Sequence, residues 1–342
     1  MKKKILVTGG TGYIGSHTSV ELINDGYEVV IIDNLHNSDA DVANRIGKIT
    51  GVKPGLEIFD LCDKERLTDF FETNPGIAAI IHFAAYKAVG ESVRKPLEYY
   101  HNNLVSLLNL LDLMGRYSVT NMVFSSSCTV YGQPEKLPVA EDSPLQPAAS
   151  PYGNTKKIGE EIIRDATLTG NNIRAISLRY FNPIGAHPTS LIGEIPKGIP
   201  ENLVPYMTQT GIGLRDELKV FGNDYNTPDG SCIRDYLHVC DLANAHLVAV
   251  KRLIENSNKK NFEVFNLGTG KGVSVFEAID SFERISGQKL NYRIMGRREG
   301  DIEKIWADPS FANSELGWKT RYSLDDAMRS AWEWEKKIRK NK

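Results

Sequence analysis

A tyrosine and a lysine stand four residues apart in the segment SPYGNTK, residues 150–156. Ser-Pro begins a predicted helix, so Tyr152 and Lys156 should lie one turn apart on the same face. A phenol has a reference pKa of about 10, but an ammonium held beside it favours the phenolate. Tyr152 could then accept a proton from a substrate hydroxyl. Surface Tyr/Lys pairs are common, so this spacing alone does not establish the chemistry.

Hydroxyl side chains follow an apolar run in the segment FSSSCTVYG, residues 124–132. Groups at the carboxyl end of a parallel strand face the ligand crevice of an open α/β sheet. Ser127 could therefore bridge a substrate oxygen and the Tyr152 phenol and relay a proton between them. For Ser125 and Ser126 we favour a turn role without a ligand.

Three glycines, Gly9, Gly12 and Gly15, lie in TGGTGYIG between a predicted strand and a predicted helix. In that context they allow a tight turn, close approach of a pyrophosphate and close packing of helix on strand. A plain glycine turn would explain the bare spacing about as well. Asp33 favours the dinucleotide site, because it closes the next predicted strand roughly 20 residues later, where an acid accepts from the adenosine ribose.

The surroundings of Asp33 predict NAD as the cofactor. A carboxylate repels the 2′-phosphate of NADP, and no Arg or Lys lies between Asp33 and Asp41 to neutralise one. Asp60, just past the next predicted strand, is placed to meet the adenine. An acid at a helix N-terminus explains Asp60 nearly as well.

Strand and helix signals alternate along the first 182 residues, which predicts an α/β fold with a doubly wound parallel Rossmann sheet and a smaller C-terminal substrate-binding lobe. The NAD-binding domain should comprise residues 1–182 plus about 236–267, and the substrate-binding domain residues 183–235 plus about 268–342. The expected strands are 5–7, 28–33, 56–59, 78–83, 121–126, 174–179 and 264–267. The expected helices are about 13–25, 63–73, 97–116, 152–169 and 238–255. In the helix over 97–116, Leu104, Leu107, Leu108 and Leu111 have the spacing of a buried stripe.

The 342 residues carry a formal net charge of -2, which gives no electrostatic reason to expect nucleic acid or a membrane surface as a partner. The four cysteines form no C-x-x-C pair, so reduced thiols and a cytoplasmic location are expected. The seven histidines show no zinc-type spacing, and we expect no metal.

The order and number of longer motifs add a family resemblance. From Lys4 to about Trp334 the chain resembles the UDP-glucose 4-epimerase family of extended short-chain dehydrogenases/reductases. The motifs that carry it are TGGTGYIG, IIDN, HFAAYKAVGES, FSSSCTVYG, SPYGNTK, RYFNPIGAHP, GIPENLVPY, FGNDY, RDYLHV and RREGD. The resemblance implies an isomerase that interconverts UDP-glucose and UDP-galactose by reversible NAD-mediated oxidation at sugar C4, through a 4-keto intermediate. It also implies a homodimer formed through the helices 97–116 and 152–169.

The resemblance assigns three groups of site residues. The catalytic set is Ser127, Tyr152 and Lys156. The cofactor-binding set is Gly9, Gly12, Tyr13, Ile14, Gly15, Asp33, Asn34, Asn37, Ser38, Asp60, Leu61, Phe83, Ala84, Ala85, Lys87, Asn102, Ser127, Tyr152, Lys156 and Tyr180. The substrate-binding set is Lys87, Ser127, Tyr152, Phe181, Asn182, Asn202, Leu203, Phe221, Arg234, Tyr236, Arg298, Asp301 and Ile305.

The chemistry of the substrate set agrees with a UDP-sugar. Arg234 and Arg298 suit a diphosphate through forked, charge-assisted hydrogen bonds, and Asp301 can accept from uridine ribose hydroxyls. Surface ion pairing with Glu299 or Asp235 competes with this interpretation for each arginine. By the resemblance, Ile305 bounds the sugar pocket.

Three other functions compete with this one. A related UDP-N-acetylglucosamine 4-epimerase would share these motifs. A nucleotide-sugar dehydratase needs an acid pair immediately before V-Y-G, where this chain has Cys128 and Thr129. A dinucleotide-binding regulator without turnover would have no need of Ser127, Tyr152 and Lys156 together.

Overall fold

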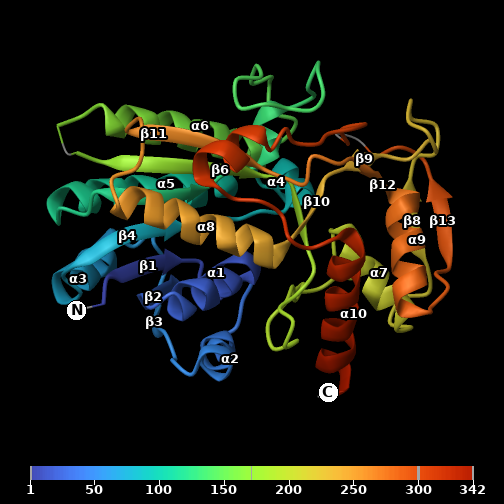
Figure 1. The fold of residues 1–342 in the computed structure, drawn as a ribbon, viewed down its shortest axis with the longest axis horizontal. Coiled ribbons are helices and arrows are strands. Elements are labelled where there is room, and N and C mark those ends of the chain that lie inside the picture. The colour runs from blue at the N-terminus through green and yellow to red at the C-terminus, as the bar shows by residue number, and fades with distance from the viewer. Residues whose placement is uncertain (1, 171, 299–300, 341–342) are drawn as a thin grey trace.

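The protein's structure, a computed structural model, describes residues 2–170, 172–298 and 301–340. Within these residues seven parallel strands form one sheet in the order β11-β6-β5-β4-β1-β2-β3 (Figure 1). The strands are β1 (Lys4–Thr8), β2 (Glu28–Asp33), β3 (Gly55–Ile58), β4 (Ile77–His82), β5 (Asn121–Ser125), β6 (Arg174–Tyr180) and β11 (Phe262–Leu267). This order confirms the predicted doubly wound parallel sheet.

Alternate side chains of each central strand enter different cores. In β1, Ile5 and Val7 pack with one set of helices, and Leu6 packs with the other. Both faces of the sheet are therefore buried, which is why the strands are almost continuously apolar. One face is covered by α1 (Tyr13–Asn24), α2 (Asp41–Thr50) and α8 (Val239–Ile254), and the other by α3 (Lys64–Thr73), α5 (Pro96–Arg116) and α6 (Pro151–Thr167).

The second lobe has a core of its own and lies at the α7–α9–α10 end of the molecule (Figure 1). Met207, Phe282 and Trp332 are buried in this core. Ser274 and Glu277 form the reciprocal capping box that starts α9. The lobe contains β7 (Asn182–Ile184), α7 (Leu203–Gly211), β8 (Leu218–Phe221), β9 (Ile233–Arg234), β10 (Tyr236–His238), β12 (Val273–Ser274), α9 (Val275–Ser286), β13 (Tyr292–Met295) and α10 (Leu324–Lys340).

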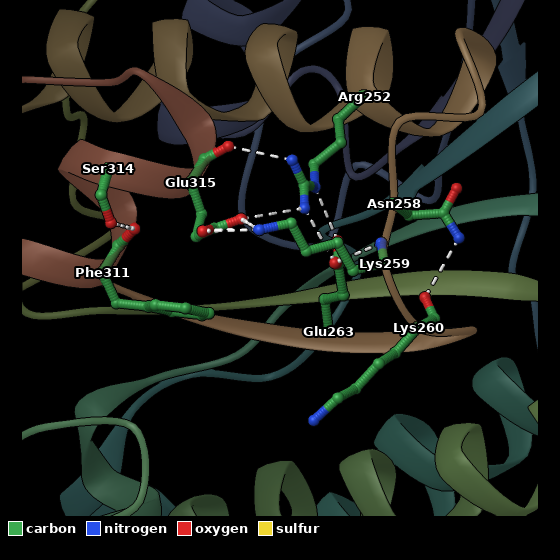
Figure 2. Close-up of polar contacts among 8 residues, drawn as sticks. All are labelled: Arg252, Asn258, Lys259, Lys260, Glu263, Phe311, Ser314 and Glu315. Carbon is green, nitrogen blue, oxygen red and sulfur yellow. Dashed lines mark hydrogen bonds and ion pairs between the residues drawn. The ribbon is translucent and has the colours of Figure 1, made fainter.

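An ion-pair cluster attaches the π-helical segment η2 (Ala312–Leu316) to the sheet domain (Figure 2). Arg252 of α8 donates from Nε and Nη2 to Glu263 of β11, at 2.7 and 2.9 Å. Glu315 of η2 accepts from Lys259 Nζ at 2.8 Å, and its backbone carbonyl accepts from Arg252 Nη1 at 2.9 Å. The cluster therefore joins η2 to α8 and β11, two consecutive elements that come much earlier in the sequence.

The expected leucine stripe on α5 is partly wrong. Leu107 and Leu111 are buried, but Leu108 is exposed and Leu97 more so. Only one side of α5 packs against the sheet and α6, so leucines one position around the helix face outward. None of the described helices is both long and apolar enough to span a membrane.

Candidate active site

The glycine loop forms a cradle between β1 and α1. Gly9 has a φ of +69°, and a Cβ built there would lie 2.8 Å from the backbone nitrogen of Ala84. A Cβ on Gly15 would lie 2.3 Å from the Gly9 carbonyl oxygen. A Cβ on Gly12 would meet only that same carbonyl within 4 Å among the described residues, so this side of the loop opens onto free space. The N-cap Gly12 has no side chain to occupy the first-turn amides of α1, which leaves them available to an anion.

Asp33 lies beside this cradle at the end of β2, as the sequence predicted. Its carboxylate accepts from the backbone amides of Thr11 and Leu35, at 3.2 and 2.9 Å, and from Ser38 Oγ at 3.0 Å. Three donors therefore hold the carboxylate in a fixed position next to the glycine loop. Asn37 is exposed in the same loop.

A second acid, Asp60, lies next to the loop that follows Asp33. Asn34 Nδ2 donates to Asp60 Oδ2 at 2.9 Å, and the Cys62 amide donates to Asp60 Oδ1 at 2.8 Å. Burial raises the pKa of Asp60, but these donors outweigh it and the pKa is lowered. Leu61 is buried beside it, and the backbone carbonyl of Asn102 on α5 lies 3.7 Å from Cys62 Sγ.

A lysine that sequence reasoning missed reaches the Asp33 loop from the second lobe. Lys197 Nζ donates to the backbone carbonyls of Leu35 and His36, at 3.0 and 2.9 Å. No Arg or Lys lies between Asp33 and Asp41 in the sequence, yet the fold places this ammonium on the loop that follows Asp33. No local pattern in the sequence indicates this contact, because the two segments are about 160 residues apart.

The predicted catalytic residues come together at the carboxyl end of β5. Tyr152 and Lys156 are buried on the first turns of α6, with Lys156 Nζ 6.0 Å from the centre of the Tyr152 ring. Ser127 is the buried N-cap of the 3₁₀ turn Cys128–Tyr131, and its Oγ accepts from the Thr129 amide at 3.2 Å. Ser150 caps α6 by accepting from the Gly153 amide, which fixes where the helix and its Tyr152 begin.

Burial dominates the electrostatics of this pair. Burial raises the pKa of Tyr152 well above its ordinary value, with the neighbouring Tyr180 adding to the rise and the Ser127 hydroxyl opposing it. Burial lowers the pKa of Lys156 to about 8, against a smaller raising effect of Glu160. Lys156 Nζ donates to the Ser125 carbonyl at 2.7 Å and not to the phenol. Lys156 alone therefore does not lower the pKa of Tyr152 enough to favour the phenolate that the sequence predicted, because both groups are buried away from solvent.

Aromatic rings line the neighbouring strand ends. The Tyr180 hydroxyl lies 2.7 Å from Ser125 Oγ, so Ser125 has a partner in the site and is not a simple turn residue. The Phe83 ring lies 4.6 Å from the ring of His246, which is buried on α8. Half-buried Ala84 and Ala85 continue the segment after β4. These residues surround the crevice on the side of β4 and β6.

The charged residues of the substrate set cluster around Asp301. Arg298 Nη2 donates to Asp301 Oδ1 at 2.8 Å, and Arg234 Nη2 lies 4.0 Å from the same oxygen. The Arg298 guanidinium also lies 5.7 Å from the centre of the exposed Phe221 ring. Asp235, the competing partner for these arginines, is buried and accepts from the Thr269, Gly270 and Ala307 amides. The other competing partner, Glu299, lies outside the described residues.

A second group of predicted residues meets at Glu194. Its Oε1 accepts from Lys87 Nζ at 3.2 Å and from Asn202 Nδ2 at 2.8 Å. Asn202 is the N-cap of α7, so Leu203 starts that helix. Tyr13 also reaches the second lobe, because its hydroxyl donates to the Gly185 carbonyl at 2.6 Å, while Ile14 packs on the sheet core.

The remaining substrate residues lie along the junction of the lobes. Asn182 on β7 pairs with Tyr236 on β10, and Tyr236 is buried. Phe181 and Ile305 share one small core with Val130 of the 3₁₀ turn that Ser127 caps. Ile305 is only 2% exposed, so its side chain forms part of the wall behind that turn. Among the described residues, no cluster of three or more His, Cys, Asp or Glu has the arrangement of a metal site.

Comparison with known proteins gives a consistent result. The sequence profile of the NAD dependent epimerase/dehydratase family matches residues 5–268. The chain is 50% identical to a UDP-glucose 4-epimerase of Bacillus subtilis, covering 97% of this chain and 96% of the relative. It is 49% identical to one of Dictyostelium discoideum, covering 97% and 95%. The crystal structure of a UDP-glucose 4-epimerase from Bifidobacterium longum, in complex with NAD+ and UDP, is 44% identical, with a TM-score of 0.94 over 98% of both chains.

Proposed function

This chain belongs to the NAD-dependent epimerase/dehydratase family, and we propose that it is an isomerase that interconverts UDP-glucose and UDP-galactose. The observation that carries the proposal is the buried Tyr152–Lys156 pair beside Ser127 at the end of β5. Close similarity to UDP-glucose 4-epimerases along nearly the whole chain supports the same reaction.

The glycine cradle and Asp33 fit NAD. The steric limit at Gly9 and the free space beside Gly12 suit a pyrophosphate at the start of α1, and the fixed carboxylate of Asp33 suits the two ribose hydroxyls. Bound NAD supplies a hydride acceptor and donor for sugar C4, together with a positive charge on its oxidised ring. We assign the remaining contacts to the other members of the cofactor-binding set, with Tyr180 and Phe83 toward the crevice.

Residues of the chain itself transfer the proton of the sugar 4-hydroxyl. Tyr152 is the group that takes the proton from the sugar 4-hydroxyl and returns it, and Ser127 connects that hydroxyl to the phenol. Lys156 keeps a positive charge close to the phenol, and this charge stabilises the phenolate during transfer. Burial raises the pKa of Tyr152, so the site without cofactor holds a neutral phenol. Tyr152 can therefore accept the sugar proton only after its own proton has gone to solvent, a loss that the positive charges of Lys156 and of bound oxidised NAD would favour.

The second lobe holds the UDP part of the substrate. Arg234 and Arg298 converge on Asp301, so a diphosphate would find two guanidinium groups already gathered at one place. Asn182, Asn202, Leu203, Phe221 and Tyr236 complete our assignment of this side. We propose a division into an NAD-binding domain, residues 1–182 plus about 236–267, and a UDP-sugar-binding domain, residues 183–235 plus about 268–342.

Our proposal for sugar selectivity rests on Ile305. Its branched side chain packs with Phe181 and Val130 behind the catalytic turn. An apolar pocket discriminates by only about 1–3 kcal/mol per methylene-sized difference. We therefore propose preferred turnover of UDP-glucose and UDP-galactose, with slower turnover of UDP-N-acetylglucosamine.

We also propose a homodimer in which α5 and α6 pair with their copies, and a cytoplasmic location. Exposed leucines on α5, Leu97 and Leu108, would be covered by such a partner. The four free cysteines agree with a reducing compartment.

The test is turnover of UDP-galactose and UDP-N-acetylgalactosamine by the purified protein, with both epimers of each sugar measured. We expect UDP-glucose to form without an equivalent amount of free NADH, because hydride leaves and returns to the same carbon. NADH that accumulates in proportion to product would contradict the proposal. Formation of a 4-keto-6-deoxy product would instead indicate a dehydratase, which Cys128 and Thr129 argue against, and absence of any turnover would favour a binding regulator.

A further inference from the structure

A buried ion pair lies directly behind the catalytic residues. Glu160 is on α6 and Arg179 is on β6, and their side chains are 1% and 4% exposed. Arg179 Nη2 donates to Glu160 Oε2 at 2.6 Å, and its Nε donates to Oε1 at 2.9 Å. A pair with this geometry is a strong, directional contact between the helix and the strand.

Hydrogen bonds connect this ion pair to the residues on both sides of the Ser127 turn. Glu160 Oε1 accepts from Ser126 Oγ at 2.6 Å, and Ser126 is bonded to Ser127 through the peptide link. Arg179 Nη1 donates to the Tyr131 hydroxyl at 2.9 Å, and Tyr131 ends the 3₁₀ turn that Ser127 caps. The residues before and after the Ser127 turn are therefore attached to the same ion pair.

Glu160 is also one turn beyond Lys156 on α6. Its two oxygens are occupied by Arg179, Ser126 and Ser177, the last donating from Oγ at 2.8 Å. Lys156 Nζ donates to the Ser125 carbonyl instead. Arg179 thus satisfies the Glu160 carboxylate, and among the described residues Lys156 has no direct ionic partner and keeps its charge beside Tyr152.

We propose that Glu160 and Arg179 form a positioning pair for proton transfer, which aligns the Ser127 turn with the Tyr152–Lys156 helix and keeps the Glu160 carboxylate away from the Lys156 ammonium. This role rests on the proposed epimerase function. Neither residue touches the reacting atoms in our assignment, since both lie behind the turn and the helix. Glu160 is also a poor candidate for an acid or base, because both of its carboxylate oxygens already accept hydrogen bonds from Ser126, Ser177 and Arg179.

The pH dependence of turnover separates this role from simple packing. The groups that face Lys156 are Tyr152 and Glu160 on α6, His82 on β4, the Phe124 ring and Ser125 carbonyl on β5, and Tyr180 beyond Ser125. Of these, Glu160 raises the pKa of Lys156. Glu160→Gln removes that charge, so the alkaline limb of the kcat profile should move to lower pH. Arg179→Met leaves the Glu160 charge uncompensated, so the limb should move to higher pH.

The experiment compares variants of this pair with variants of a matched pair elsewhere in the whole protein. Arg252 and Glu263 form a similar two-bond ion pair, 9% and 8% exposed, on α8 and β11 (Figure 2). With UDP-galactose, Glu160→Gln and Arg179→Met should lower kcat by roughly 10- to 100-fold with little change in KM, as expected for misplaced catalytic groups. Arg252→Met and Glu263→Gln should keep the native kcat. Arg179→Lys should restore part of the rate.

A double variant removes the problem of a misfolded single variant. Replacing both residues of a buried ion pair by apolar residues often preserves stability, whereas replacing only one of them leaves an unpaired buried charge and destabilises the protein. Glu160→Met with Arg179→Met should therefore unfold at nearly the native temperature and still turn over slowly. The alkaline limb of its kcat profile should lie at lower pH than that of the native protein, because the Glu160 charge that raises the pKa of Lys156 is gone, and a loss of packing alone would not move this limb.

The result that overturns the positioning role is a double variant with native kcat, or single variants whose alkaline limbs stay in place and whose kcat values match those of the Arg252–Glu263 variants. Failure of the native protein to epimerise UDP-galactose would instead overturn the proposed function. The two failures are therefore distinguishable in one set of assays.

Discussion

Replacing Lys156 with methionine should remove turnover without destabilising the protein. Lys156 is 4% exposed, and burial lowers its pKa from 10.5 to about 8. Holding the charged lysine in the folded protein at pH 7 therefore costs about 3 kcal/mol relative to the unfolded chain. Methionine fills a similar volume and removes this cost, but it leaves the Ser125 carbonyl without its donor, which costs about 1–3 kcal/mol.

The two terms nearly cancel, so the free energy of unfolding at pH 7 should be unchanged or up to about 2 kcal/mol higher in the variant. Turnover should fall by roughly 10²- to 10³-fold, because the charge that stabilises the phenolate is lost. Lys157→Met, at the next and less buried position of α6, is the control and should change neither quantity.

The assay is denaturant unfolding from pH 7 to pH 10 at equal NAD content, because bound NAD adds to apparent stability. The folded pKa of Lys156 is depressed, so the native protein carries the full penalty below about pH 8 and loses it progressively as pH rises toward 10.5. Relative to the variant, the native protein should therefore gain stability above pH 8. A stability difference that stays constant over this range, or a variant that unfolds far more easily at pH 7, would refute the reasoning.

Four further outcomes are expected. Tyr152→Phe should lower kcat by roughly 10²- to 10⁴-fold while NAD binding survives, and near-normal kcat would remove Tyr152 from the catalytic set. Asp33→Ala should weaken NAD and relax discrimination against NADP, as measured by fluorescence titration of both; an unchanged affinity ratio would contradict the ribose contact. Ile305→Tyr and Ile305→Gly should change the ratio of kcat/KM for UDP-glucose and UDP-N-acetylglucosamine in opposite directions, and two unchanged ratios would place Ile305 outside the pocket. Light scattering at micromolar concentration should give the mass of a dimer, and a monomer would exclude the α5–α6 pairing.

The sequence predicted the sheet because its signals are local. Each strand is an apolar run that ends in a turn, and each helix has its own cap or stripe, so the alternation could be recognised one segment at a time. The Tyr152–Lys156 spacing is equally local, since one helical turn separates the two residues. The glycines and Asp33 were recognisable for the same reason, as they flank the same first strand–helix–strand unit.

Contacts between distant segments could not be predicted in this way. Lys197 reaches the Asp33 loop, and Arg179 meets Glu160, only because the sheet order brings those segments together. The direction of the Tyr152 pKa depends on how much solvent the whole fold excludes, which no local pattern encodes. The outward-facing Leu108 shows the same limit, because a leucine at helical spacing does not reveal where the packed side ends.

The path of the chain through the sheet also constrains how the protein is synthesised. Strand β6 carries Arg179 and Tyr180 but completes its pairing only with β11, which follows after the part of the second lobe from β7 to β10 has been synthesised. At ribosomal rates of roughly 5–20 residues per second, β6 waits on the order of ten seconds with one edge open. The nascent chain can form its glycine loop early, yet the strand behind the catalytic helix stays incomplete until Phe262–Leu267 has emerged. During that interval the open edge of β6 can pair wrongly with another strand.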